Sequence, residues 1–230
     1  MDRLASVPDT GVQVLDRAVA LLDVIARDGA ASLAELVAAT ELPRPTAHRL
    51  AVALERHGVL TRDPDGRFVL GAKVAAWGAI AGRGLAPAAG PVLADLVAET
   101  GESAQLYVRE GDRRVCVAVH ERPSGLRDTV PLGAVLPLER GSGGTVLRAW
   151  AADVPETREL AAARRRGWAE SVAEREAGVA SVSAPVTDRN GAVVAAISVS
   201  GPIERLGRQP GRRLARAVVA AAETLSDRIA

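Results

Sequence analysis

The stretch LPRPTAHRLAVALERHG, residues 42–58, predicts a short helix whose N-terminal end carries hydrogen-bond donors. Pro45 suits the first turn of a helix, where an N–H has no partner, and Gly58 suits the end. An apolar stripe follows at helical spacing, made of Ala47, Leu50, Val52, Ala53 and Leu54. The donors are Arg44, Thr46, His48 and Arg49. A short helix with one buried face and such an end fits the major groove of DNA.

Two helices are predicted before this stretch. Apolar residues at helical spacing from Val12 to Ala26 indicate a supporting helix, which ends before Gly29. Ser32 stands three residues before Glu35, the spacing of a capping box, and opens a second, short helix. A break at residues 40–43 leads into the helix of residues 42–58. The order is that of a helix-turn-helix.

A hairpin is predicted directly after residue 58. Residues 59–62 and 67–70 read as strands, and the DPDG sequence of residues 63–66 is typical of a tight turn. A hairpin in this place is a wing, with Arg62 and Arg67 beside its tip. Between Arg44 and Arg67 five arginines stand against three carboxylates. We therefore expect the wing arginines to contact phosphates or the minor groove, contacts that position a protein without reading sequence.

The remaining chain predicts a linker and a second domain of α+β class. Residues 72–84 form a plausible linker helix that ends at the glycine pair Gly82 and Gly84, which gives domains of residues 1–71 and 85–230. Strands are expected at 104–108, 114–119, 129–138 (two short ones), 178–186 and 192–200. Helices are expected at 91–100, 145–151, 156–166 and along the C-terminal segment, with a Gly/Ser loop at 141–144. Helices that flank a mostly antiparallel sheet make an α+β domain.

Composition excludes several classes of protein. The net charge of the 230-residue chain is only +1, so any DNA binding must depend on local placement of charge. No apolar run is long enough to span a membrane and no signal peptide is evident, so a cytoplasmic protein is expected. No metal or nucleotide motif is present, so no cofactor is expected. The single cysteine, Cys116, is read as a small buried hydrophobe; His120 shares its strand face by spacing, but no third catalytic member is evident.

Longer motifs resemble the IclR-type bacterial transcriptional regulators along almost the whole chain. They are VQVLDRA (12–18), LPRPTAHRL (42–50), GRFVLG (66–71), EREAGVASVSAPV (174–186) and AAISVSGP (195–202). Other segments resemble one actinobacterial subgroup, the NdgR/AreB-type regulators of leucine-biosynthesis genes. These are RPTAHRLAVALE (44–55), GESAQLY (101–107), SGLRDTVPLG (124–133) and RRRGWAES (164–171).

The resemblance implies a winged helix-turn-helix, a linker helix and a GAF-like effector-binding domain, in homodimers or dimers of dimers. It implies a regulator of double-stranded operator DNA, with no enzymatic activity and no membrane contact. The chain departs from the family at residues 138–145, LERGSGGT, where many members have a His-Ala-Thr/Ser stretch. Since this loop lies by the family's effector pocket, the resemblance does not imply the usual ligand classes for this chain.

Two sets of candidate site residues follow. The DNA-binding set is Ser32, Arg44, Pro45, Thr46, His48, Arg49, Arg62 and Arg67. The effector-binding set, matched from the family's pocket, is Leu126, Leu136, Ser142, Gly143, Ser171, Ser181, Ser198 and Ser200. Alternation along a strand puts Ser198 and Ser200 on one face, and amides near Ser142 precede a helix, which suits an anion.

The expected ligand is a small carboxylic acid or an amino-acid-related metabolite. The alternatives are a solvated helix end for the first set, N-capping alone for Ser32, and small residues that only permit close packing for the second set. At the level of function, the rivals are a constitutive DNA-binding regulator whose C-terminal domain only oligomerises, and a small-molecule enzyme with a helical appendage.

Overall fold

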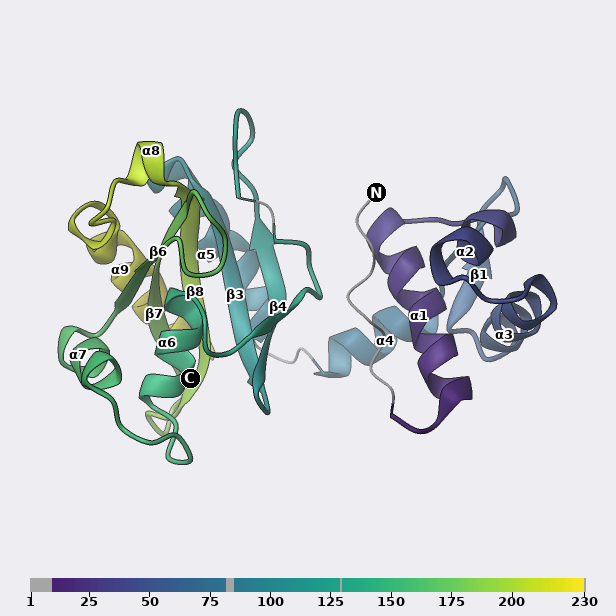
Figure 1. Ribbon diagram of the computed structural model, residues 1–230, viewed down its shortest axis with the longest axis horizontal. Coiled ribbons are helices and arrows are strands. Elements are labelled where there is room, and N and C mark those ends of the chain that lie inside the picture. Colours follow the sequence, from purple (N-terminus) through teal and green to yellow (C-terminus); the bar gives the residue numbers. More distant parts are fainter. Residues whose placement is uncertain (1–9, 82–84, 129, 230) are drawn as a thin grey trace. The chain divides into compact units, whose positions relative to one another are not determined.

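The computed structural model describes residues 10–81, 85–128 and 130–229, and the chain divides into two compact units, residues 1–81 and 82–230. Each unit is described by itself (Figure 1). The sequence placed this division near residue 84, in the segment 82–84, which lies outside the described residues. The linker expected at 72–84 contains helix α4, Ala72–Ala81.

The N-terminal unit is a helix-turn-helix followed by a hairpin. Its elements are α1 (Gln13–Asp28), α2 (Leu33–Thr40), α3 (Arg44–Arg56), β1 (Leu60–Arg62), β2 (Phe68–Leu70) and α4. The capping box at the start of α2 is present: the Ser32 hydroxyl accepts from the Glu35 amide, and the Glu35 carboxylate accepts from the Ser32 amide at 2.7 Å. Glu41, in the left-handed region at φ 56°, ends α2 and turns the chain toward α3.

The core of this unit places α3 differently from the predicted stripe. Ala47 and Ala51, four residues apart, are fully buried against Leu36 and Phe68 in the same cluster. Leu50 and Leu54 are only half-buried at the edge of that core, and Ala53 is exposed. Two alanines at the centre let α3 approach α1 and α2 closely, so the larger leucines are left at the rim.

The C-terminal unit confirms the α+β class. In the described residues its sheet has six antiparallel strands in the order β5-β4-β3-β8-β7-β6. The strands are β3 (Ser103–Glu110), β4 (Arg113–His120), β5 (Val135–Pro137), β6 (Ala169–Val172), β7 (Val179–Thr187) and β8 (Val193–Pro202). The helices are α5 (Leu85–Thr100), α6 (Ser142–Ala149), α7 (Arg158–Arg166), α8 (Ile203–Leu206) and α9 (Gly211–Ile229).

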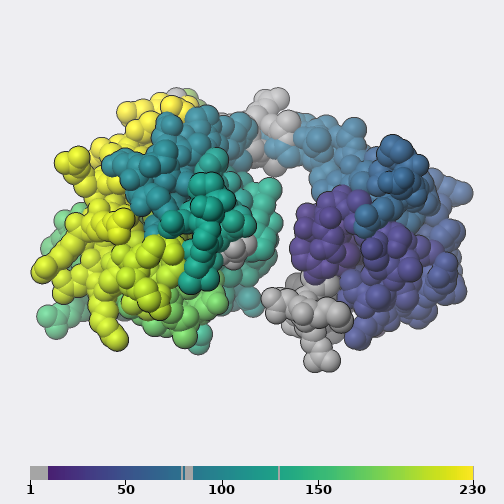
Figure 2. All heavy atoms as spheres, turned by 90° about the horizontal axis from the view of Figure 1, so that it is seen from above, coloured from purple at the N-terminus to yellow at the C-terminus, as the bar shows by residue number. Residues whose placement is uncertain are grey.

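Helices cover both faces of this sheet. On one face α5 and α9 pack on each other and on the sheet through a core that includes Leu93, Ile197 and Leu214. The two helices also lie next to each other in the space-filling view, in teal and yellow (Figure 2). On the other face α6 and α7 pack over a second core that contains Tyr107 and Cys116. The polar groups described below lie on this second side.

Several boundaries differ from the sequence expectation. Helix α5 begins at Leu85 instead of 91, with Pro91 inside it, because Leu85, Ala88 and Ala89 add contacts to the core formed with α9. Residues 142–144 are the first turn of α6 rather than a loop. The segment 129–138 contains the single described strand β5, and Thr129 lies outside the described residues. The short elements β6 and α8 were not predicted, because neither is long enough to show a periodic pattern.

Candidate functional sites

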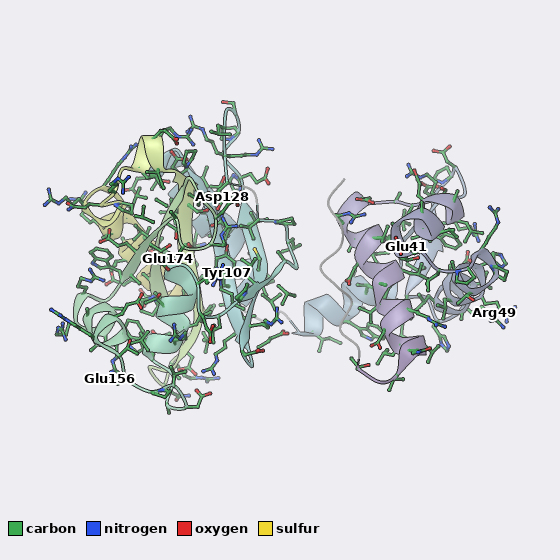
Figure 3. All side chains as sticks on the ribbon, viewed as in Figure 1. Glu41, Arg49, Tyr107, Asp128, Glu156 and Glu174 are labelled. Atoms are coloured by element: carbon green, nitrogen blue, oxygen red, sulfur yellow. The ribbon has the colours of Figure 1, made fainter. Side chains whose placement is uncertain are left out.

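The N-terminal end of α3 presents a group of unengaged donors. Arg44, His48 and Arg49 are exposed, while Ala47 between them is fully buried and anchors the helix. Within the described residues, no side chain or carbonyl pairs with these three side chains. Figure 3 shows Arg49 directed away from the body of the unit. Pro45 is exposed and Thr46 half-buried in the first turn.

The wing arginines are engaged by the protein itself. Arg62 donates from Nε to a Glu55 oxygen and from Nη1 to the Gly66 carbonyl, both at 3.0 Å, and its guanidinium lies 4.1 Å from the Phe68 ring centroid. Arg67 donates from Nη2 to the Ala30 carbonyl at 2.9 Å and to Glu35 at 3.1 Å. These bonds fix the wing against α2 and α3. Both side chains keep about two fifths of their surface exposed, 40% and 42%, so DNA contacts by them stay a prediction.

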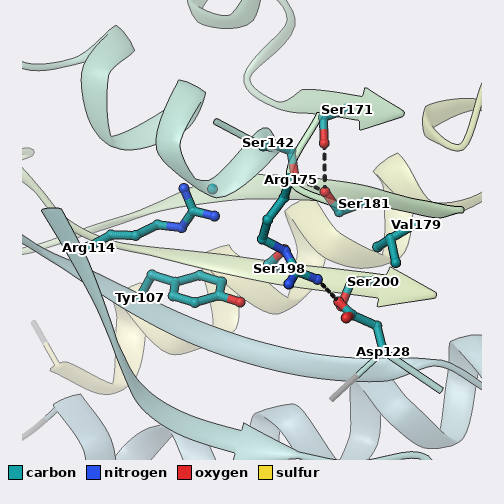
Figure 4. Close-up of a pocket in the computed structure, with 12 residues that line it drawn as sticks. Tyr107, Arg114, Asp128, Ser142, Ser171, Arg175, Val179, Ser181, Ser198 and Ser200 are labelled. Atoms are coloured by element: carbon teal, nitrogen blue, oxygen red, sulfur yellow. Dashed lines mark hydrogen bonds and ion pairs between the residues drawn. The ribbon is translucent and has the colours of Figure 1, made fainter. Parts of the chain in front are cut away.

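The C-terminal unit gathers most of the effector candidates around one pocket (Figure 4). All but Leu126 and Leu136 of the eight candidates line it: Ser142, Gly143, Ser171, Ser181, Ser198 and Ser200. They come from α6, β6, β7 and β8. The cavity has a volume of about 20 Å³, the space of a single water molecule.

The two leucines are a correction to the sequence expectation. Leu126 is 72% exposed and does not line the pocket, because the Arg205 side chain holds its carbonyl at 2.7 Å and its own side chain faces solvent. Leu136 lies on β5 opposite Arg114 and packs at the edge of the second core instead. Neither residue that was matched by family position is therefore part of the pocket lining.

Serine hydroxyls form a continuous ladder along the pocket wall. Ser142 Oγ lies 2.7 Å from both Ser181 Oγ and Ser183 Oγ, and Ser171 Oγ lies 3.1 Å from Ser181 Oγ. Ser183 donates to Ser198 at 2.9 Å. Hydroxyl groups both donate and accept, so this wall can rotate its protons to meet a polar ligand of either kind.

Charged residues in the lining were missed by sequence reasoning. Arg114 is only 3% exposed, and its Nη1 donates to the carbonyls of Pro137, at 2.7 Å, and Arg140. Arg175 forms an ion pair with Asp128, whose side chain is 3% exposed. In Figure 4 one of the dashed lines joins Arg175 and Asp128, and Arg114 extends beside Tyr107. Arg114 lies 5.1 Å from the centroid of the Tyr107 ring.

Burial governs the ionisation of this cluster. Desolvation raises the pKa of Tyr107 and lowers the pKa of Arg114, which the Arg175 charge lowers further. Desolvation opposes the charge of Arg175 as well, but its hydrogen bond and ion pair with Asp128 raise the pKa overall. Since arginine stays protonated in proteins, both guanidinium groups are permanent cations in the wall.

One signal for the missed residues was available in the sequence. Arg114 alternates with the apolar Cys116, so an arginine stands on the buried face of a strand, which requires a partner. Asp128 and Arg175 lie in loops, where no periodicity marks a residue as buried. Their meeting depends on how the two loops close over the sheet and was beyond prediction.

Cys116 behaves as a buried hydrophobe. It is 0% exposed, and desolvation raises the pKa of its thiol to about 11. The expectation that His120 shares its face was wrong, because a β-bulge in the β3–β4 pairing shifts the register between Tyr107–Cys116 and Leu106–Ala118. Cys116 therefore faces the second core, whereas Ala118 packs on the first. Among the described residues there is no cluster of His, Cys, Asp and Glu that would hold a metal ion, and no helix long and apolar enough to cross a membrane.

Comparisons with known proteins agree with this architecture. Residues 14–64 match the model of the IclR helix-turn-helix domain, and residues 78–157 and 156–227 match that of the bacterial transcriptional regulator IclR C-terminal domain. The glycerol operon regulatory protein of Streptomyces griseus is 31% identical over 222 residues, which cover 85% of this chain and 87% of that protein.

Solved structures show the same fold. The IclR of Thermotoga maritima superposes with a TM-score of 0.70 at 25% identity and covers 94% of this chain and 98% of its own. An IclR homologue from Microbacterium hydrocarbonoxydans, complexed with 4-hydroxybenzoate, superposes with a TM-score of 0.69 at 23% identity, with 93% of this chain and 99% of its own covered.

Proposed function

Because the chain belongs to the IclR family of bacterial transcriptional regulators, we propose that a small carboxylate in the serine-lined pocket controls how tightly α3 holds operator DNA. The protein is a DNA-binding regulator with a C-terminal effector domain and is not an enzyme. The proposal concerns which residues perform these two tasks and which ligand links them.

The proposed DNA contacts centre on the open end of α3. Arg44 and Arg49 are exposed and have no partner within the described residues, so their guanidinium forks are available to guanine edges. Pro45, Thr46 and His48 lie in the same exposed turns. Ser32, Arg62 and Arg67 would add phosphate contacts, with the arginines sharing donors between the protein and the duplex. The free donors of α3 are the observation that carries the proposal.

The proposed ligand is a small carboxylic acid or an amino-acid-related metabolite. The pocket supports it with the serine ladder, the first turn of α6, the buried Arg114 and the half-buried Arg175. The relative from Microbacterium hydrocarbonoxydans was crystallised with 4-hydroxybenzoate, itself a carboxylate. Control of leucine-type amino-acid genes is the finer proposal and rests on the NdgR/AreB-like segments; the relative from Streptomyces griseus is instead a regulator of a glycerol operon.

A gel-shift experiment tests the proposal. The full-length protein is titrated onto the DNA upstream of its own gene and onto an unrelated fragment of equal length, with and without branched-chain amino acids and their 2-oxo acids. We expect preferential binding to the upstream DNA and a change of affinity with at least one acid. Equal binding to both fragments contradicts the proposal of sequence-specific reading.

The constitutive alternative makes a different prediction in the same experiment. If the C-terminal unit only oligomerises, specific binding persists but no acid alters it, and calorimetry detects no binding of the acids to the protein. The two arginines of the lining and the serine ladder favour a ligand pocket over a purely packed interior.

A further inference from the structure

We infer that Asp128 is an internal stand-in for the carboxylate of the effector, and that a small hydroxy or oxo acid enters the pocket by displacing Asp128 from Arg175. The inference deepens the proposed function and rests on it for the role of the ligand as an effector of DNA binding. It assigns Arg175 and Arg114 as the carboxylate-binding groups and Asp128 as their competitor.

The Asp128–Arg175 pair is built like a bound ligand contact. Asp128 enters the pocket lining from a loop, with a side chain only 3% exposed, and meets the Arg175 guanidinium there. Arg175 keeps 20% of its side chain exposed and also lies 3.5 Å from the outer carboxylate of Glu176. Asp128 thus brings to this cation the same functional group that a free carboxylic acid would bring.

A second cation in the wall lacks part of its expected bonding. Within the described residues, Arg114 Nε is buried without a hydrogen-bond partner, although the residue is only 3% exposed. Leaving a buried, charged donor unpaired costs free energy, so a ligand that supplies an acceptor to this N–H gains binding free energy. The lining itself has two arginines and one carboxylate, Asp128, while Glu176 and Glu174 lie at its edge, next to Arg175 and to the Gly141 amide.

The rest of the lining selects the kind of acid. The first turn of α6 starts at Ser142 in the lining, and amides at a helix start favour negative charge. Next to this turn, the hydroxyls of Ser171, Ser181 and Ser198 suit a ligand oxygen adjacent to a carboxylate. Tyr107 and Val179 are the apolar contributors to the lining. This balance fits a short hydroxy or oxo acid better than a long alkyl or aromatic acid.

The exchange conserves charge in the pocket. One carboxylate leaves Arg175 and another takes its place, so no additional charge is buried. Asp128 must then move away from Arg175. Its loop is held two residues earlier, where Arg205 donates to the Leu126 carbonyl at 2.7 Å and also pairs bidentately with the buried Glu102. This firm anchor limits the movement to the residues near Asp128.

Chemical rescue of Asp128→Ala tests the inference without DNA. The carboxylate of acetate can take the space of the removed carboxylate, with its methyl group in the adjoining cavity, so saturating acetate should raise the Tm of Asp128→Ala by roughly 3–5 °C more than equal chloride or neutral acetamide does. The wild type should need at least tenfold more acetate for the same rise in Tm, because Asp128 competes with acetate for Arg175. Asp128→Asn, which keeps the shape without the charge, should bind acetate tighter than the wild type and serves if the alanine variant does not fold.

Matched controls separate this site from general salt effects. Asp153 pairs bidentately with Arg109 at the surface, at 2.6 and 2.7 Å, so Asp153→Ala removes an equivalent carboxylate from an exposed pair and should show no acetate rescue. Adding Arg175→Gln to Asp128→Ala should abolish the rescue. Calorimetry with L-lactate against L-lactamide should show binding of the acid alone, tighter in Asp128→Asn than in the wild type.

The outcomes distinguish the inference from the proposed function. If neither Asp128 variant binds acetate more tightly than the wild type does, or if Asp153→Ala is rescued equally, Asp128 is not a stand-in and the inference is overturned. If the protein does not bind the upstream DNA, the acetate and lactate measurements are unaffected, and the result counts against the proposed function only.

Discussion

Ser32 combines a structural task with a proposed DNA contact, and the two can be separated by substitution. Ser32→Ala removes the N-cap of α2 and should lower stability by about 1 kcal/mol. Ser32→Asp preserves a capping oxygen, so we expect its Tm to stay near that of the wild type while its affinity for upstream DNA falls several-fold, because the new charge repels phosphate. Thermal melts and gel shifts on the same preparations check this. Unchanged affinity in the aspartate variant would remove Ser32 from the interface.

The Cys116 thiol predicts a pH dependence of stability. Its pKa is raised from an ordinary 9.0 to about 11 by burial, so the folded state holds the proton more tightly than the unfolded chain does. Its contribution is therefore complete below pH 9 and is lost as the pH rises to about 11, a loss of roughly 2–3 kcal/mol. Urea titrations at pH 8 to 11 should show the stability difference between the wild type and Cys116→Ala changing by that amount. A constant difference would mean that the thiol is not desolvated.

At the scale of elements, the N-terminus of α6 depends on glycine for close approach. A Cβ on Gly144 would lie 2.1 Å from the Leu138 carbonyl oxygen and 2.8 Å from Arg114 Nη1. Gly144→Ala should therefore destabilise the C-terminal unit by about 1–3 kcal/mol and disturb Arg114. Gly78→Ala, at an exposed helical position of α4 with nothing within 4 Å of its Cβ, is the matched control and should gain about 0.4–1 kcal/mol. Equal effects of the two changes in chemical denaturation would contradict the packing described for α6.

Helices and turns with local chemical signals were the predictable part of the fold. The capping box at Ser32, Pro45 in the first turn of α3 and the DPDG turn of the wing each specify structure through neighbouring residues. Features set by distant packing were not predictable: the early start of α5 at Leu85, and the helical first turn at Ser142, where glycines have low intrinsic helix propensity.

In the effector pocket, too, features set by local sequence were predictable and features set by distant packing were not. Serines on regular strands, such as Ser198 and Ser200, were placed correctly on one face because strand alternation determines their direction. Asp128 and Arg175 lie 47 residues apart in loops, and their pairing depends on the closed tertiary structure. A family match alone assigned Leu126 to the pocket, although its carbonyl rather than its side chain is the group that the structure uses.

For the whole molecule, exposed apolar residues support the proposed dimer. Val12, the N-cap of α1, and Leu15 and Val19 on α1 follow helical spacing and are 52%, 55% and 40% exposed, and Trp77 and Ile80 on α4 are 51% and 63% exposed. Paired half-sites on DNA need two copies of α3, so a self-association surface is expected. Leu15→Glu should weaken self-association and DNA affinity together, whereas Ala38→Glu, at an exposed position of α2, should change neither oligomeric state nor stability. Light scattering after size exclusion measures the mass of both variants, thermal melts measure their stability and gel shifts their DNA affinity; an unchanged mass for Leu15→Glu would place the interface elsewhere.

The central claim, that the open end of α3 reads DNA, is tested most directly by the affinity of Arg49→Ala for the upstream DNA, measured by fluorescence anisotropy at fixed salt. Arg56→Ala is the matched control, because Arg56 is also an exposed arginine and lies in the last turn of the same helix. The account predicts a loss of about 1–3 kcal/mol for Arg49→Ala, roughly 5- to 150-fold, together with reduced discrimination against unrelated DNA, and a much smaller loss for Arg56→Ala. Equal affinity of Arg49→Ala and the wild type for the upstream DNA would contradict it.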